Sequence, residues 1–103
     1  MAFSPVTIDG QDRGWFGLGP VAVEPKQQGI GIGSKLIRTG LARLRAAGAN
    51  GCVVLGEPDY YRRFGFRADG RLIYPGPLPQ YFQALAFGAD VPSGIVAYHP
   101  AFG

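Results

Sequence analysis

The stretch EPKQQGIGIGSKLIRTGLARLRAAGAN, residues 24–50, places three glycines directly before a long amphipathic segment. The glycines are Gly29, Gly31 and Gly33, and glycine is a poor helix former. Their position indicates either a flexible turn or a point where a ligand approaches the backbone more closely than a side chain would allow. The two explanations make different demands on the sequence before and after this stretch.

The segment behind the glycines is predicted to be a helix from Gly31 or Ile32 to Ala47. Its apolar stripe has the spacing i, i+4, i+7 and i+11, which is one face of an α-helix. A glycine at the end of the stripe is typical of a left-handed helix cap. The stripe consists of Ile37, Leu41, Leu44 and Gly48.

Two predicted strands flank this helix. Residues 16–25 have Val21 and Val23 on one face, and Pro25 ends the strand. Residues 51–56 form a continuous apolar run, the pattern of a strand that is buried on both faces. A strand, a helix and a second strand in this order predict a βαβ unit whose strands are parallel.

The other predicted elements are short. Pro5 lies inside a strand at 2–8, which indicates an edge strand or a bulge. A turn at 9–14, helical turns at 59–66 that end at Gly65, strands at 71–76 and 94–102, and a short helix opened by Pro79 complete the list. We therefore predict an α/β domain with a mixed sheet of about five strands.

Composition restricts the class of protein. The 103 residues suit one domain, and a net charge of +3 without a run of five basic residues favours a small anionic ligand over a nucleic acid. Cys52 is the single cysteine, which is typical of a reducing compartment. No apolar run approaches the ~20 residues of a membrane span, and the N-terminus does not resemble a secretory signal. We expect a soluble cytoplasmic protein that binds neither nucleic acid nor membrane.

The glycine loop can bind phosphate, because the first N–H groups of a helix are free and carry the positive end of its dipole. The alternative is that the glycines only make a tight connection between strand and helix. Neither the P-loop spacing nor the dinucleotide fingerprint fits, since Gly33-Ser34-Lys35 has the wrong order and Ser34 stands where a third glycine would be needed. Residues 28–33 have instead the form Q-x-x-G-x-G.

That form resembles the acetyl-CoA-binding motif [RQ]-x-x-G-x-[GA] of the GNAT superfamily of N-acetyltransferases. Four further segments, LGPVAVEP, SKLIRTGLARLRAAG, CVVLGEP and YYRRFGF, are similar to consecutive segments of that family, in its order and spacing, over residues 18–66. AFSP near the start and VPSGIVAYHPAF near the end resemble a bacterial subgroup of predicted acetyltransferases. The resemblance implies the acyl-CoA N-acyltransferase fold.

The resemblance also implies a cofactor site and a reaction. Acetyl-CoA would be the co-substrate and no metal would be needed; the acetyl group would pass directly to a primary amine of a small molecule or peptide in a ternary complex. Tyr61 would protonate the departing thiolate, Glu24 is a candidate general base, and the Val23 amide would stabilise the oxyanion. The residues implied to contact acetyl-CoA are Val21, Ala22, Val23, Gln28, Gly29, Ile30, Gly31, Ile32, Gly33, Ser34 and Tyr61.

Each of these roles has a structural alternative. Tyr61 can instead pack in an aromatic cluster with Tyr60, Phe64 and Phe66, and Glu24 can be a solvated residue at a strand end. Two other groups carry no chemistry in this interpretation: Cys52 is expected to be a small buried hydrophobe, and His99 has no partners for a metal site. The basic residues Lys26, Lys35, Arg62 and Arg63 either meet the CoA phosphates or are simply solvated.

Three functions remain open at this point: an N-acetyltransferase, a non-catalytic CoA-binding remnant, and a small α/β interaction module. Members of the family normally carry a strand, two helices and another strand before the segment that AFSP resembles. We therefore expect residues 1–103 to form a single incomplete domain whose strand at 2–8 is an exposed edge. A homodimer or a segment swap would cover that edge.

Overall fold

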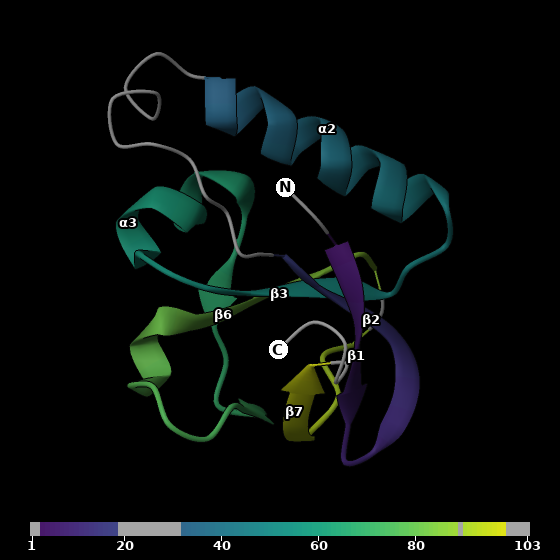
Figure 1. Ribbon diagram of the computed structural model, residues 1–103, viewed down its shortest axis with the longest axis vertical. Coiled ribbons are helices and arrows are strands. Elements are labelled where there is room, and N and C mark those ends of the chain that lie inside the picture. Colours follow the sequence, from purple (N-terminus) through teal and green to yellow (C-terminus); the bar gives the residue numbers. More distant parts are fainter. Residues whose placement is uncertain (1–2, 19–31, 89, 99–103) are drawn as a thin grey trace.

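The computed structural model describes residues 3–18, 32–88 and 90–98, with side chains from residue 34 onward in the first helix. Figure 1 shows this helix lying across one face of a curled sheet. In chain order the elements are β1 (Phe3–Ile8), β2 (Gln11–Leu18), α2 (Ile32–Ala46), β3 (Gly51–Leu55), α3 (Pro58–Tyr61), the 3-10 turn η1 (Arg62–Phe64), β4 (Arg67–Ala68), β5 (Leu72–Ile73), the 3-10 turn η2 (Pro79–Tyr81), β6 (Phe82–Ala86) and β7 (Gly94–Tyr98).

The βαβ unit is confirmed. β2 and β3 are parallel neighbours, in a register that runs from Trp15 opposite Gly51 to Leu18 opposite Val54. α2 forms the crossover between them, and its predicted stripe is confirmed, because Ile37 and Leu41 are buried. The predicted caps are confirmed as well, since Gly48 and Gly65 have φ angles of 93° and 97°.

The predicted number of strands is too low. Within the described ranges the sheet has seven strands, in the order β4-β6-β3-β2-β1-β7-β5. β4 and β5 have two residues each, too few to leave a pattern in the sequence, and β5 occupies only part of the strand predicted at 71–76. β2 begins at Gln11 because Asp9 and Gly10, with φ angles of 52° and 78°, make a two-residue hairpin turn that is shorter than the predicted 9–14.

The helix that was predicted to follow Pro79 is wrong. η2 occupies one 3-10 turn there, and residues 82–86 form β6, which pairs with β3 on one side and with β4 on the other. The apolar sequence of this segment suits a buried strand as well as a helix. Pairing with strands on both sides decides the outcome, which is a tertiary effect that overrides local preference.

The prediction of an exposed edge at β1 is also wrong. β7 pairs antiparallel with β1, placing Tyr98 opposite Val6 and Val96 opposite Ile8. The bulge indicated by Pro5 is confirmed, because the register with β2 shifts between Pro5 and Thr7. A homodimer was predicted because it would cover this edge. Since β7 already covers it, dimerisation stays a prediction without that structural support.

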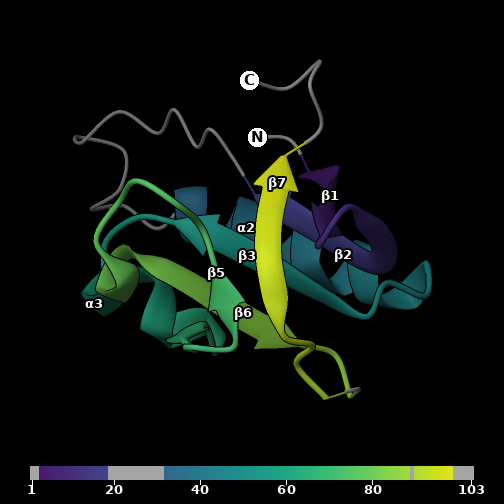
Figure 2. The same cartoon turned by 90° about the horizontal axis from the view of Figure 1, so that it is seen from below.

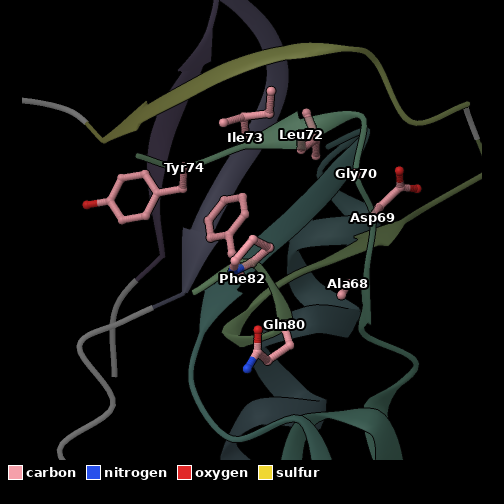
Figure 3. Close-up of a pocket in the computed structure, with 9 residues that line it drawn as sticks. Ala68, Asp69, Gly70, Leu72, Ile73, Tyr74, Gln80 and Phe82 are labelled. Carbon is pink, nitrogen blue, oxygen red and sulfur yellow. The ribbon is translucent and has the colours of Figure 1, made fainter. Parts of the chain in front are cut away.

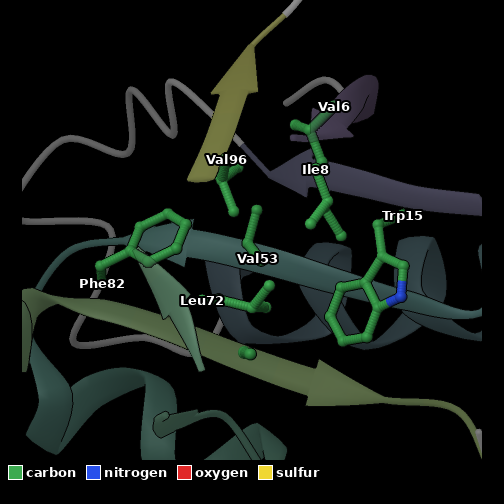
Figure 4. Packing of buried hydrophobic residues seen from close by; sticks show 8 residues of the cluster. Val6, Ile8, Trp15, Val53, Leu72, Phe82 and Val96 are labelled. Carbon is green, nitrogen blue, oxygen red and sulfur yellow. The ribbon is translucent and has the colours of Figure 1, made fainter. Parts of the chain in front are cut away.

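The sheet separates two apolar clusters. Figure 2 shows β5 and β7 on the face opposite α2, and Figure 4 shows the side chains enclosed there. The β7-side cluster is formed by Val6, Ile8, Trp15, Val53, Leu72, Phe82, Ala84 and Val96. The α2-side cluster is formed by Leu18, Ile37, Leu41, Cys52, Val54, Tyr61, Phe64 and Phe66.

Cys52 should make stability fall at alkaline pH. Burial raises the pKa of its thiol to about 12, whereas a thiol in the unfolded chain ionises near ~8.5. The buried thiol contributes its full stabilisation at pH values below the pKa that it has in the unfolded chain. This contribution is lost as the pH rises toward the pKa of the thiol in the folded protein, by about 1.4 kcal/mol per pH unit. Urea unfolding of the wild type and of Cys52→Ala, at pH values between these two pKa values, measures how steeply the free energy of unfolding falls with pH. Equal slopes in both proteins would contradict the assignment.

Candidate functional site

Tyr61 lies at the end of α3, directly after β3, with its side chain in the α2-side cluster and only 8% exposed. Its ring meets Tyr60 edge-on at 5.0 Å and Phe66 at 6.0 Å between ring centroids. Burial, with a smaller contribution from Tyr60, raises the pKa of the Tyr61 phenol above its usual value. The phenol is therefore protonated at neutral pH and available as a hydrogen-bond donor.

Gly56 allows the Tyr61 ring to lie against the end of β3. A Cβ atom at position 56 would stand 2.5 Å from Cε2 of Tyr61, closer than real side chains approach. The Gly56 backbone is fixed on both sides, because its N–H donates to the carbonyl of Tyr81 at 2.9 Å and its carbonyl accepts from Nε2 of the buried Gln83 at 3.1 Å. The position of Tyr61 is thus set by packing rather than by a flexible loop.

Gly56→Ala should destabilise the protein by about 1–3 kcal/mol, because the added methyl group overlaps the buried ring. Gly70→Ala is the matched control, since a Cβ atom there has open space within 4 Å. Thermal unfolding followed by circular dichroism compares the two variants. A Gly56→Ala protein as stable as Gly70→Ala would show that the Tyr61 ring moves away without cost.

The other aromatic residues of this segment pack around Tyr61. Phe64 lies in the α2-side cluster, and the Arg38 guanidinium stands 4.9 Å from the centre of its ring. Arg63 covers Tyr60 in the same way at 4.6 Å, while Arg62 pairs with Asp59 on the exposed surface at 3.4 Å. Packing roles are therefore observed for Tyr60 and Phe64, and none of these arginines is buried.

The described part of the glycine loop is the first turn of α2. Ile32, Gly33 and Ser34 are its opening residues, and the turn contains no acidic side chain, whereas Arg43 and Arg45 lie in the last turn. This distribution leaves the positive end of the helix dipole uncompensated by the helix itself. The remaining predicted site residues lie outside the described residues: Val21, Ala22, Val23, Glu24, Gln28, Gly29, Ile30 and Gly31.

A cavity of about 510 Å³ lies on the β7 side of the sheet (Figure 3). Phe82, which pairs with Leu55 at the end of β3, forms part of its wall, and Tyr74 stacks on Phe82 at 5.2 Å with an interplanar angle of 25°. The described residues that line it are Ala68, Asp69, Gly70, Leu72, Ile73, Tyr74, Pro79, Gln80 and Phe82. None of these residues was predicted from the sequence to belong to a site, and the three in the segment 79–87 were assigned to a helix.

The structure describes only some of the residues to which the sequence analysis assigned no chemistry or an uncertain role. Cys52 is fully buried, as predicted for a small hydrophobe, and His99 and Lys26 lie outside the described residues. In the part of the chain that the structure describes, no group of three metal-ligating side chains occurs. No helix found there is long and apolar enough to cross a bilayer.

Known proteins resemble this chain over most of its length. The model of the acetyltransferase (GNAT) domain matches residues 3–68. The uncharacterized N-acetyltransferase YhbS of Escherichia coli strain K12 is 38% identical over 109 residues, which span 99% of this chain and 65% of that protein. The uncharacterized N-acetyltransferase YjhQ of the same organism is 48% identical over 63 residues, or 60% of this chain and 35% of that protein.

Two solved structures share the fold. A GNAT family acetyltransferase from Brucella melitensis, in complex with acetyl-CoA, superposes with a TM-score of 0.80 at 60% identity and covers 98% of this chain. YhbS from Escherichia coli, in complex with CoA, superposes with a TM-score of 0.86 at 35% identity and covers 97%. This chain spans 58% and 59% of their lengths. The predicted fold is confirmed, and the chain belongs to the GNAT family of acetyltransferases.

Proposed function

We propose that this chain binds acetyl-CoA and transfers its acetyl group to an amine. The observation that carries the proposal is the position of Tyr61, a buried phenol held against Gly56 where the parallel strand β3 ends. Ligands of α/β sheets bind at this carboxyl edge of the strands. A relative at 60% identity was solved with acetyl-CoA, which supports the same ligand here.

The pyrophosphate of acetyl-CoA would bind the first turn of α2. Its negative charge is attracted to the free N–H groups and the positive dipole end of the helix, and the first turn contains no acidic residue that would repel it. The loop residues Gln28, Gly29, Ile30 and Gly31 would complete this cradle together with Ile32, Gly33 and Ser34. The pantetheine arm would then lie along residues 21–23 toward the carboxyl ends of β2 and β3.

The reaction needs no covalent enzyme intermediate. The amine nitrogen attacks the thioester carbonyl, a C–N bond forms, the C–S bond breaks, and one amine proton is finally carried by the CoA sulfur. Tyr61 donates its phenolic proton to the departing thiolate and is reprotonated by the proton that the new amide loses. Glu24 is the candidate general base, and the Val23 amide is the candidate donor to the oxyanion.

Acetyl-CoA binding can be tested by reversing the charge at the helix start. Ser34→Asp should weaken acetyl-CoA binding at least tenfold, because the carboxylate faces the same N–H groups as the pyrophosphate. The free protein should be no less stable, since an acidic residue in the first turn suits the helix dipole. Thr39→Asp adds the same charge at an exposed position further along α2 and should leave binding unchanged.

Isothermal titration calorimetry gives the affinities, and release of free CoA thiol in the presence of amines gives the rates. No binding of acetyl-CoA by the wild type would overturn the proposal. Binding without turnover for any amine would identify the chain as a CoA-binding remnant rather than an enzyme. Equal affinities for Ser34→Asp and Thr39→Asp would place the pyrophosphate somewhere other than the start of α2.

A further inference from the structure

The cavity on the β7 side of the sheet adjoins the point where Tyr61 lies on the other side. Leu55, the last residue of β3, pairs with Phe82 of the cavity wall, and the next residue, Gly56, contacts Tyr61. Tyr61 belongs to the α2-side cluster and Phe82 to the β7-side cluster. The cavity and the phenol therefore approach the same strand end from opposite faces of the sheet. Both border the carboxyl end of β3, the edge at which ligands of α/β sheets bind.

The cavity wall is apolar apart from Asp69, Gln80 and the hydroxyl of Tyr74, and the charge of Asp69 is already paired. The Arg71 guanidinium donates to both carboxylate oxygens of Asp69, from Nε at 3.0 Å and from an Nη at 2.8 Å. These hydrogen bonds hold the pKa of Asp69 below its usual value. A cationic ligand would have to compete with Arg71 for this carboxylate, the one acidic group among the described lining residues.

The aromatic residues of the cavity do not form an open cage for a cation either. One face of Tyr74 stacks on Phe82, and its ring meets Tyr98 at 5.3 Å with an interplanar angle of 80°. Cages that bind ammonium groups present unoccupied ring faces to the ligand. Here the ring surfaces are used to build the wall. At the rim, Ile73 is 54% exposed and extends the apolar surface to solvent.

We propose that this cavity receives the acetyl acceptor and that the acceptor is an amine that is uncharged at neutral pH and has an apolar, ring-sized body, such as an arylamine. The inference rests on the proposed function. A cavity of about 510 Å³ is in the range of small-molecule sites. An uncharged amine loses little hydration on entering it, whereas an ammonium group would be partly desolvated there without meeting an unpaired carboxylate. Its nitrogen lone pair is free, so it attacks the thioester without prior deprotonation.

The test compares two isomeric amines, para-ethylaniline and phenethylamine. Both have the same atoms and nearly the same volume, but at neutral pH the first is uncharged and the second is protonated. The rate of CoA release should be at least tenfold higher with para-ethylaniline. Raising the pH should increase the rate with phenethylamine, because more of it becomes uncharged. The rate with para-ethylaniline should change little, because this amine is already uncharged at neutral pH.

A carboxylate added at the rim should weaken the preference for the uncharged amine. Ile73→Glu places an unpaired charge at the cavity and should shift the ratio of the two rates at least fivefold toward phenethylamine. Ile95→Glu is the matched control: Ile95 is the strand partner of Ile73, is 51% exposed and does not line the cavity. Both variants replace an exposed isoleucine, so both should fold.

Acetyl-CoA binding is measured separately by calorimetry, which distinguishes the two levels of the proposal. If acetyl-CoA binds and phenethylamine or another protonated amine is the better acceptor, the inference is wrong while the proposed function stands. Equal rate ratios for Ile73→Glu and Ile95→Glu would also overturn it. If acetyl-CoA does not bind, the proposed function fails, and this inference fails with it.

Discussion

Tyr61→Phe should lower kcat for acetyl transfer by about 10²–10⁴-fold, the range that a positioned general acid contributes. The substitution removes one oxygen and leaves the ring in the α2-side cluster, where it contacts Tyr60 and Phe66. The affinity for acetyl-CoA and the thermal midpoint should therefore change little. Steady-state CoA release, calorimetric titration and thermal unfolding measure the three quantities on the same preparation.

The neighbouring tyrosine provides a control for that experiment. The hydroxyl of Tyr60 is buried and has no hydrogen-bond partner among the described residues. A buried polar group without a partner is unfavourable by about 1–3 kcal/mol, so Tyr60→Phe should keep kcat and be no less stable than the wild type. Equal loss of kcat in both variants would indicate that the aromatic cluster, rather than the Tyr61 proton, supports the rate.

Trp15→Ala should lower the free energy of unfolding by about 3–5 kcal/mol, the usual effect of truncating a large aromatic side chain in a core. Trp15 is 1% exposed, and its ring fills the β7-side cluster so closely that a Cβ atom at Gly51 would stand 2.5 Å from it. Domains of this size are stable by about 5–15 kcal/mol. The variant is therefore expected to lose a large share of its stability.

Urea unfolding of this variant must be followed by circular dichroism, because Trp15 is the single tryptophan of the chain. Ile95→Ala removes an exposed apolar side chain and should change stability by less than about 0.5 kcal/mol. Trp15→Phe should have a stability between those of Trp15→Ala and Ile95→Ala, since a smaller ring still fills part of the space. A Trp15→Ala protein as stable as Ile95→Ala would show that the cluster closes around the vacancy.

The predictable half of the fold is the part that is built from near neighbours in the chain. The stripe through Ile37 and Leu41, the apolar run at 51–56 and the cap at Gly65 each follow from periods or local backbone preferences of a few residues. The errors lie where distant segments meet. β6 resembles a helix until β3 and β4 pair with it, and β1 resembles an edge until β7, some 90 residues further on, pairs with it.

The same distinction between near neighbours and distant segments holds for the candidate site. The sequence alone determined the βαβ unit, the glycine-rich start of α2 and the position of Tyr61 in the short helix after β3, because all of these lie within one continuous stretch of chain. Only the tertiary structure decided that Gly56 leaves room for the Tyr61 ring and that Phe82 and Tyr74 build a cavity beside the same strand end. The physical reason is that burial and pairing depend on which distant residues share a face of the sheet, and no local period in the sequence records that.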